Sequence, residues 1–177
     1  MNLDQELVEE AEIASSLFTR IIGFLARLAG GLSAVLVVAT LSITGYSVFQ
    51  RYVLGTPLTW TDELSGFLVV AIVMLGAAEA LRRGDHISVD LLSDKASGFK
   101  KTMLQFWAYL STAMVAAVLF ISGWGAVTFS WNIGVYSDGY LEAPLWIPQT
   151  FLLIGSGLLF LLSVARLIDL FLFRRQK

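Results

Sequence analysis

Hydrophobic and polar positions in this chain separate into long apolar runs and short charged segments. Four apolar runs stand out, at about residues 28–49, 64–81, 106–131 and 145–165. A helix that crosses the hydrocarbon core of a bilayer needs roughly 20 apolar residues, and all four runs are close to that length. Inside lipid a chain must satisfy its own backbone hydrogen bonds, which favours helices over open strands. The pattern predicts an all-α integral membrane protein, with residues 1–177 forming a single domain of four transmembrane helices.

The composition supports a membrane protein and excludes several kinds of site. Of the 177 residues, 56% are hydrophobic and 15% are charged, whereas soluble domains carry about 25% charged residues. The chain has no cysteine and one histidine, His86, which excludes disulfides, thiolate metal sites and a bis-histidine haem within one chain. The sequence contains no phosphate-binding loop, nucleophile elbow or zinc signature. We therefore expect a non-enzymatic protein without catalytic residues, metal or cofactor.

The distribution of lysine and arginine predicts the orientation in the membrane. Eleven of the twelve basic residues lie before residue 28, within residues 82–101 or after residue 165, and the twelfth is Arg51. Because basic residues concentrate in cytoplasmic segments, we expect both termini and the 82–101 loop in the cytoplasm. Residues 50–63 and 132–143 are then outside. The aromatic residues that prefer the headgroup layer agree with these outer ends: Tyr52, Trp60, Trp131, Tyr136, Tyr140 and Trp146.

Two cytoplasmic segments show amphipathic spacing. Residues 1–27 carry leucine and isoleucine at about helical intervals, with five acids and no base among the first twelve residues, which is not the pattern of a signal peptide. In the 82–101 loop, Val89, Leu92, Ala96 and Phe99 form an apolar stripe. We expect each segment to lie as a helix on the inner membrane surface or against a partner.

Glu79 is the one acid well inside a predicted span. Intramembrane acids often have a function, but Arg82 and Arg83 follow it at i+3 and i+4. A local ion pair near the cytoplasmic end is therefore the main interpretation, and a proton or coupling-ion site is the alternative. His86 stands among acids and arginines in a loop, which favours a polar surface or helix-start residue over a catalytic or metal-binding one.

The spans contain too few polar groups to line a hydrophilic substrate path. They have no pair of helices broken by glycine or proline at matching positions, the pattern of a transporter core. Small residues instead recur at four-residue steps, which is typical of closely packed membrane helices: Gly30 and Ala34, Ala113 and Ala117, Ser122 and Ala126, with Gly155 and Gly157 in the last span. This argues for a subunit that works with a partner. A membrane anchor that binds haem or quinone for a redox enzyme is a further alternative, disfavoured by the loop position of His86.

Two loop motifs resemble signatures of a known family. "RYVLGTPLTWTDE" is similar to the segment after the first span of the small permease subunits (DctQ type) of TRAP transporters, the tripartite ATP-independent periplasmic transporters. "RRGDHISVDLL" is similar to the second signature of that family. The matching positions are Arg51, Tyr52, Gly55, Trp60, Asp62 and Glu63 in the first motif and His86, Ile87, Val89 and Asp90 in the second.

The resemblance implies a function and partners. Such systems import organic acids across the bacterial inner membrane with a sodium or proton gradient. They combine a periplasmic substrate-binding protein, a large permease subunit (DctM-like) that holds the ion and substrate sites, and a small four-span subunit. The small subunit is expected to brace the large one and to help dock the binding protein, with lipid around it. The alternative is an autonomous, oligomeric four-span carrier that uses Glu79 to couple transport to protons.

The segment between the first two spans leaves two interpretations open. If Gly55 and Pro57 turn the chain back, we expect Arg51 to reach Asp62 and Glu63 and to fix the junction of the two spans. A plain interfacial turn anchored by aromatic rings fits the residues as well as a docking site does. The resemblance favours a structural junction that also faces the permease or the binding protein.

Overall fold

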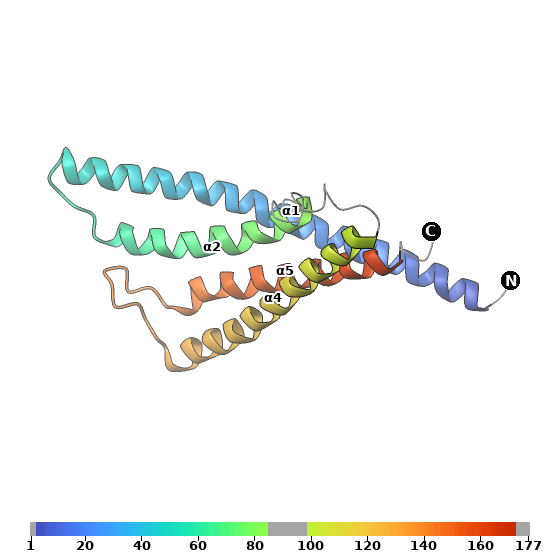
Figure 1. Cartoon of the computed structure of the whole chain (residues 1–177). Coiled ribbons are helices and arrows are strands. Elements are labelled where there is room, and N and C mark those ends of the chain that lie inside the picture. The colour runs from blue at the N-terminus through green and yellow to red at the C-terminus, as the bar shows by residue number, and fades with distance from the viewer. Residues whose placement is uncertain (1–2, 85–98, 173–177) are drawn as a thin grey trace.

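The computed structural model describes residues 3–84 and 99–172, and long helices joined by short connections make up this part of the chain (Figure 1). Its elements are α1 (Leu3–Tyr52), α2 (Trp60–Arg83), α4 (Phe99–Ile133) and α5 (Trp146–Leu172). Each contains a stretch long and apolar enough to cross a membrane: Thr19–Tyr52, Trp60–Arg83, Thr102–Ile133 and Trp146–Leu170. The predicted all-α fold with four spanning helices is confirmed. The amphipathic stripe predicted in the 82–101 loop lies, apart from Phe99, outside the described residues.

The first helix is far longer than its predicted span. α1 continues without a break for 50 residues, or about 75 Å at roughly 1.5 Å per residue. Figure 1 shows its N-terminal end extending beyond the ends of the other helices. The N-terminal segment was expected to lie as a helix on the inner membrane surface or against a partner, and the structure makes it helical and continuous with the first span. Nothing in the sequence interrupts α1, because the first proline is Pro57.

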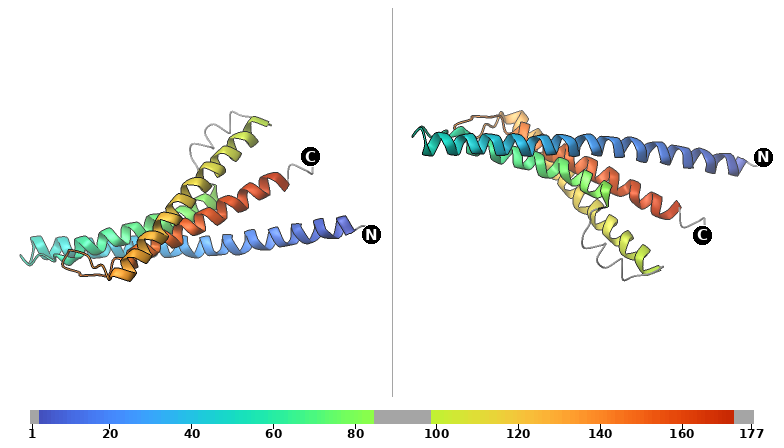
Figure 2. Two further views of the ribbon diagram at one scale, coloured as in Figure 1. Left: turned by 90° about the horizontal axis from the view of Figure 1, so that it is seen from below. Right: turned by 90° about the horizontal axis from the view of Figure 1, so that it is seen from above.

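The helices are arranged as an open row rather than a closed bundle. Contacts join α1 to α2, α2 to α5 and α5 to α4, with a smaller contact between α1 and α5. Among the described helices, α4 therefore packs against α5 alone, and α5 touches the other three. Figure 2 shows the N-terminal ends of α1 and α4 pointing in different directions. Only 17–28% of the most apolar stretch of each span is buried by the rest of the chain, so broad apolar faces stay uncovered.

Small residues form most of the contact between the helices. Most buried hydrophobic residues are alanines, and Ser156 and Ser163 of α5 are fully buried. A Cβ atom added to Gly155 would lie 2.5 Å from the Met74 carbonyl oxygen, so α5 crosses α2 at backbone distance there. Such close approach lets dispersion forces and backbone polarity hold membrane helices together where hydrophobic burial supplies little. The prediction of small-residue packing is borne out at this glycine.

Candidate functional site

The polar side chains of interest lie in two regions, which are found at opposite ends of the long axes of the helices. The first, here called the turn end, consists of residues 47–63 and 130–146. It contains the predicted motif between the first two spans and the loop between α4 and α5. The second, here called the arginine end, consists of residues 79–84 and 162–169. The predicted second motif, with His86, Ile87, Val89 and Asp90, lies outside the described residues.

The chain turns sharply between α1 and α2. The Val53 amide donates to the Phe49 carbonyl at 2.9 Å, and the Thr56 amide donates to the Gln50 carbonyl at 3.1 Å. Gly55 has a φ of +70°, a left-handed conformation that a residue with a Cβ atom adopts only with strain. The left-handed backbone conformation therefore explains why the motif has glycine at this position.

Arg51 pairs with Asp62 across this turn. The Arg51 Nη2 atom lies 3.7 Å from the Asp62 Oδ2 atom, with the two side chains 50% and 77% exposed. The predicted reach of Arg51 to Asp62 is confirmed. Exposed pairs of this kind typically contribute 0 to about 1 kcal/mol, so this pair alone does not hold the junction. Tyr52, at the end of α1, is exposed, as is Trp60 at the start of α2.

A buried pair of hydroxyl groups makes a stronger link between α1 and α2. Ser47 and Thr61 lie 2.8 Å apart, oxygen to oxygen, and both residues are buried. The Thr61 hydroxyl donates to the Leu58 carbonyl at 2.8 Å, which leaves Ser47 as the donor between them. Sequence reasoning missed this pair, because serine and threonine near the end of a span look like ordinary interfacial residues.

Glu63 connects this turn to the loop between α4 and α5. Its Oε2 atom accepts a hydrogen bond of 3.0 Å from the Leu141 amide. A Cβ atom added to Gly139 would overlap the Glu63 carboxylate, so the loop backbone approaches closely there. The Oε1 atom is buried and has no hydrogen-bond partner within the described residues. Glu63 was expected near Arg51, but its side chain accepts a hydrogen bond from the α4–α5 loop instead.

The loop between α4 and α5 is itself an ordered structure. The Ser137 amide donates to the Ala143 carbonyl at 2.9 Å, and the Leu145 amide donates to the Val135 carbonyl at 3.0 Å. The Ala143 amide also donates to the Ser137 hydroxyl at 3.0 Å. At the base of the loop, Trp131 and Trp146 pack edge to face with ring centroids 4.9 Å apart. Glu63 therefore docks onto a firm backbone.

Replacing Gly139 by alanine is expected to detach the loop from α2. The added methyl group would displace the Glu63 carboxylate, so the hydrogen bond to Leu141 is lost and a buried acceptor goes unpaired, at about 1–3 kcal/mol. Thermal unfolding in detergent micelles, followed by circular dichroism, measures the loss. Gly66→Ala is the matched control, because nothing lies within 4 Å of the position of its Cβ atom. Equal melting temperatures for the two variants would contradict the contact.

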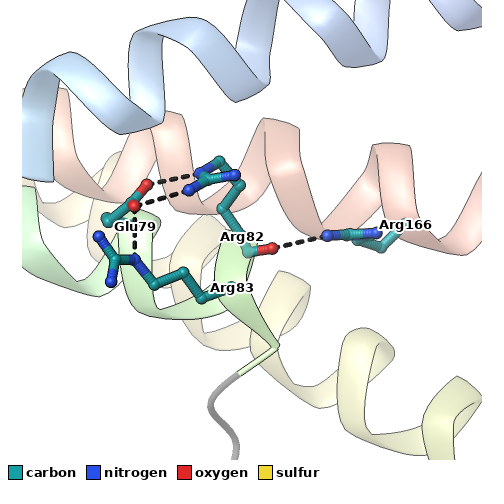
Figure 3. Close-up of polar contacts among 4 residues, drawn as sticks. All are labelled: Glu79, Arg82, Arg83 and Arg166. Atoms are coloured by element: carbon teal, nitrogen blue, oxygen red, sulfur yellow. Dashed lines mark hydrogen bonds and ion pairs between the residues drawn. The ribbon is translucent and has the colours of Figure 1, made fainter.

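At the arginine end, one carboxylate binds two arginines (Figure 3). Glu79 accepts from Arg82 through both oxygens, at 2.6 Å from Nε and 2.8 Å from Nη2. It also accepts from Arg83 Nε at 2.7 Å. The Glu79 side chain is only 11% exposed. The predicted local ion pair is confirmed. Both carboxylate oxygens of Glu79 accept hydrogen bonds from guanidinium groups.

The same cluster joins α2 to its neighbours. Arg166 of α5 donates from Nη2 to the Arg82 carbonyl at 2.7 Å (Figure 3). That carbonyl lies in the last turn of α2, where intrahelical donors run out. A Cβ atom added to Gly30 of α1 would lie 2.5 Å from Glu79 Cγ, so the acid packs directly on the α1 backbone. Three helices therefore meet around the buried Glu79 carboxylate and the arginines that bind it.

Most hydroxyl groups within the spans are bonded to their own helices. Each of six serines and threonines donates to a carbonyl three or four residues earlier: Thr40, Ser111, Thr112, Thr150, Ser156 and Ser163. Ser33 of α1 donates instead to the Ile72 carbonyl of α2, at 2.9 Å. Within the described residues, no group of three or more His, Cys, Asp or Glu side chains is placed to hold a metal. The arrangement suits helix packing and loop positioning.

Comparison with known proteins identifies the family. A family model described as "Tripartite ATP-independent periplasmic transporters, DctQ component" matches residues 40–173, which is most of the chain. The chain belongs to this family. The DctQ match includes the whole turn end, the arginine end and residues 85–98.

Several relatives of this DctQ family chain carry names of TRAP transporter permeases. The chain is 26% identical over 83 residues to the sialic acid TRAP transporter small permease protein SiaQ of Vibrio cholerae, covering 47% of each protein. It is 26% identical over 105 residues to the C4-dicarboxylate TRAP transporter small permease protein DctQ of Rhodobacter capsulatus, covering 59% of this chain and 46% of that protein.

A third relative is a much longer protein. The chain is 30% identical over 91 residues to the sialic acid TRAP transporter permease protein SiaT of Haemophilus influenzae, covering 49% of this chain and 15% of SiaT. In all three comparisons the match spans less than half of the relative.

Proposed function

We propose that this DctQ family protein acts as a non-catalytic scaffold that braces the large permease subunit (DctM-like) of a TRAP transporter. The open row of helices carries this proposal. A closed bundle would bury its apolar residues, whereas here α4 packs on one neighbour and most of each span stays uncovered. Two broad apolar faces let the row contact lipid on one side and a partner on the other.

The relatives support a large membrane partner. SiaT carries the name of a permease, and its match to this chain covers only 15% of its length. A segment similar to this chain thus occurs within a much larger permease. For the present chain, we take this as support for association with a separate subunit of the same kind.

We place the turn end on the periplasmic side and both termini in the cytoplasm. The concentration of basic residues elsewhere supports this orientation, since Arg51 is the only one among residues 50–63 and 132–143. The turn end also exposes acids, including Asp62, Asp138 and Glu142, and the ring of Tyr140. Exposed aromatic rings on an ordered surface are suited to contact with a soluble protein, and exposed acids steer a partner of opposite charge. We therefore propose that this surface helps dock the periplasmic substrate-binding protein.

The proposed scaffold role leaves substrate and ion binding to the partner. Most hydroxyl groups of the described spans bond to helix carbonyls, and Glu79 is held by two arginines, an arrangement that suits helix packing more than a hydrophilic path. We propose that the complete system imports organic acids across the inner membrane with an ion gradient. The names of two relatives, which mention sialic acid and C4-dicarboxylate, support the organic acid class.

Reconstitution into vesicles tests the proposal. The test uses this chain alone, a large TRAP permease subunit from the same organism alone, and both together with a periplasmic binding protein. We expect gradient-driven uptake of radiolabelled organic acids only from the complete set. Uptake by this chain alone at the rate of the full set would overturn the scaffold role.

A paired substitution examines the docking surface within the same assay. Replacing Asp62 and Glu63 by alanine is expected to lower uptake severalfold, because the junction loses the Arg51 pair and the bond to Leu141. Asp138→Ala removes an exposed acid of the same surface that makes neither of these contacts, so an equal loss of uptake in that variant would assign the effect to surface charge and not to the junction. If the double substitution left both complex assembly and uptake unchanged, the segment would be a mere turn.

A further inference from the structure

The arginine end carries more positive charge than its carboxylates balance. Glu79 faces the guanidinium groups of Arg82 and Arg83, and Arg166 joins them through the Arg82 carbonyl. Asp169, one turn beyond Arg166 on α5, is the second acid of the cluster. Three arginines and two acids leave one net positive charge. Within the described residues of this end that excess is unbalanced, so it attracts an anion.

The α1 helix adds two more arginines at the same level. Gly23 of α1 lies against Arg82, with 3.9 Å between its added Cβ atom and Arg82 Cδ. Arg20 and Arg27, one turn away on either side of Gly23, are both exposed. Helical spacing puts residues three and four apart on one face. The positive charge therefore extends along α1.

Two guanidinium groups of the cluster have donors without a partner in residues 3–84 and 99–172. Arg83 uses only Nε to bind Glu79, and its side chain is 62% exposed. Both of its Nη groups lack a hydrogen-bond partner among the residues that the structure describes. Arg166 uses only Nη2. The bond at Nε holds the Arg83 guanidinium in place and leaves its opposite edge, with two parallel N–H groups, open to an anion with paired oxygens.

The position of these donors indicates which anion they meet. The apolar stretch of α2 ends at Arg83 and that of α5 at Leu170. Side chains at the end of a spanning helix lie at the depth of the lipid headgroups, where phosphodiester groups are the abundant anions. Basic pockets between membrane helices on the cytoplasmic side bind anionic headgroups in this way.

We propose that the arginine end binds the headgroup phosphate of an anionic phospholipid, with Arg83 and Arg166 as the donors. Arg82 stays bound to Glu79, and Glu79 positions Arg83 through the bond to its Nε atom. The net positive charge selects a lipid with a net negative headgroup over a zwitterionic one. This inference rests on the cluster alone and does not depend on the scaffold role.

Native mass spectrometry of the purified full-length protein in a neutral detergent tests the site. Phosphatidylglycerol and phosphatidylcholine serve as probes at matched concentrations. We expect preferential retention of phosphatidylglycerol by the wild-type protein. Removing each donor by Arg83→Gln and Arg166→Gln should weaken that binding about fivefold per arginine, since each basic residue contributes about 1 kcal/mol near an anionic surface.

Two further variants separate a specific site from general attraction. Arg51→Gln removes an arginine from the opposite end and should leave phosphatidylglycerol binding unchanged. Arg83→Lys keeps the charge but removes the planar pair of donors, and it should give an intermediate affinity. Each variant is first shown to melt like the wild type by circular dichroism, and Arg83→Lys, the mildest change, provides the test if the glutamine variants unfold.

Three results would overturn the proposal. The first is equal binding of both lipids by the wild type. The second is wild-type binding of phosphatidylglycerol by the variant that combines Arg83→Gln with Arg166→Gln. Alternatively, inorganic phosphate would displace the lipid at equal concentration, which would assign the site to a free phosphate ion.

Discussion

Replacing Gly155 by alanine is expected to push α5 away from α2 and to destabilise the protein. The new Cβ atom would lie 2.5 Å from the carbonyl oxygen and 2.6 Å from the carbonyl carbon of Met74. These are backbone atoms, so no side chain can rotate to make room, and the helices themselves must separate. Overpacking of this kind costs about 1–3 kcal/mol. Since α5 is the helix that contacts all the others, the loss should affect the whole row.

The measurement is unfolding in detergent micelles, followed by circular dichroism while a denaturing detergent is titrated. Gly125→Ala is the matched control, because Gly125 also lies within a helix but has nothing within 4 Å of its added Cβ atom. That variant should be as stable as the wild type or slightly more so, given the better helix propensity of alanine. If both variants unfolded at the same detergent fraction, the close α2–α5 crossing would be wrong.

Gly155 also shows where sequence reasoning about the fold ended. Apolar length and charge distribution were enough to predict four helices, because the bilayer imposes both. Small residues flanking Ser156 indicated that α5 packs closely on something. They did not say that its neighbour is Met74 of α2, since helical spacing defines a face and not the helix that covers it. The open order α1, α2, α5, α4 was therefore beyond the sequence.

The polar contacts divide in the same way. Glu79 with Arg82 and Arg83, and Arg51 with Asp62, follow from local spacing or from one short turn, and the sequence predicted both. Glu63 and Leu141 are 78 residues apart, and their contact depends on how two loops meet. A buried Ser47–Thr61 pair was likewise not predicted, because its burial is a property of the packed helices. Contacts that depend on how distant segments pack together can be identified only from the tertiary structure.

Replacing Glu79 by glutamine is expected to lower stability strongly while leaving the transport step intact. The substitution keeps the volume of the side chain but removes the charge that binds two guanidinium groups at 2.6–2.8 Å. Arg82, with a side chain 23% exposed, would remain largely enclosed without a counter-charge. Breaking one partner of a buried pair costs about 3–5 kcal/mol, and the remaining neutral hydrogen bonds place this variant near the lower value. Detergent unfolding measures the change.

Asp62→Asn supplies the comparison, since it breaks the pair between Asp62 and Arg51, in which the Asp62 side chain is 77% exposed. It should change stability by no more than about 1 kcal/mol.

The same Glu79 variant separates a scaffold from a proton-coupled carrier. A carrier that moves protons needs a carboxyl group that gains and loses a proton during each cycle, so Glu79→Gln would abolish gradient-driven uptake even in correctly assembled protein. In the structure this carboxylate is held by Arg82 and Arg83 and packs on Gly30, which leaves it as a fixed element of helix packing. We therefore expect uptake, normalised to the amount of assembled complex, to equal that of the wild type. Loss of uptake at an unchanged amount of complex would instead support the carrier, because a defect in packing acts through the quantity of complex and not through its turnover.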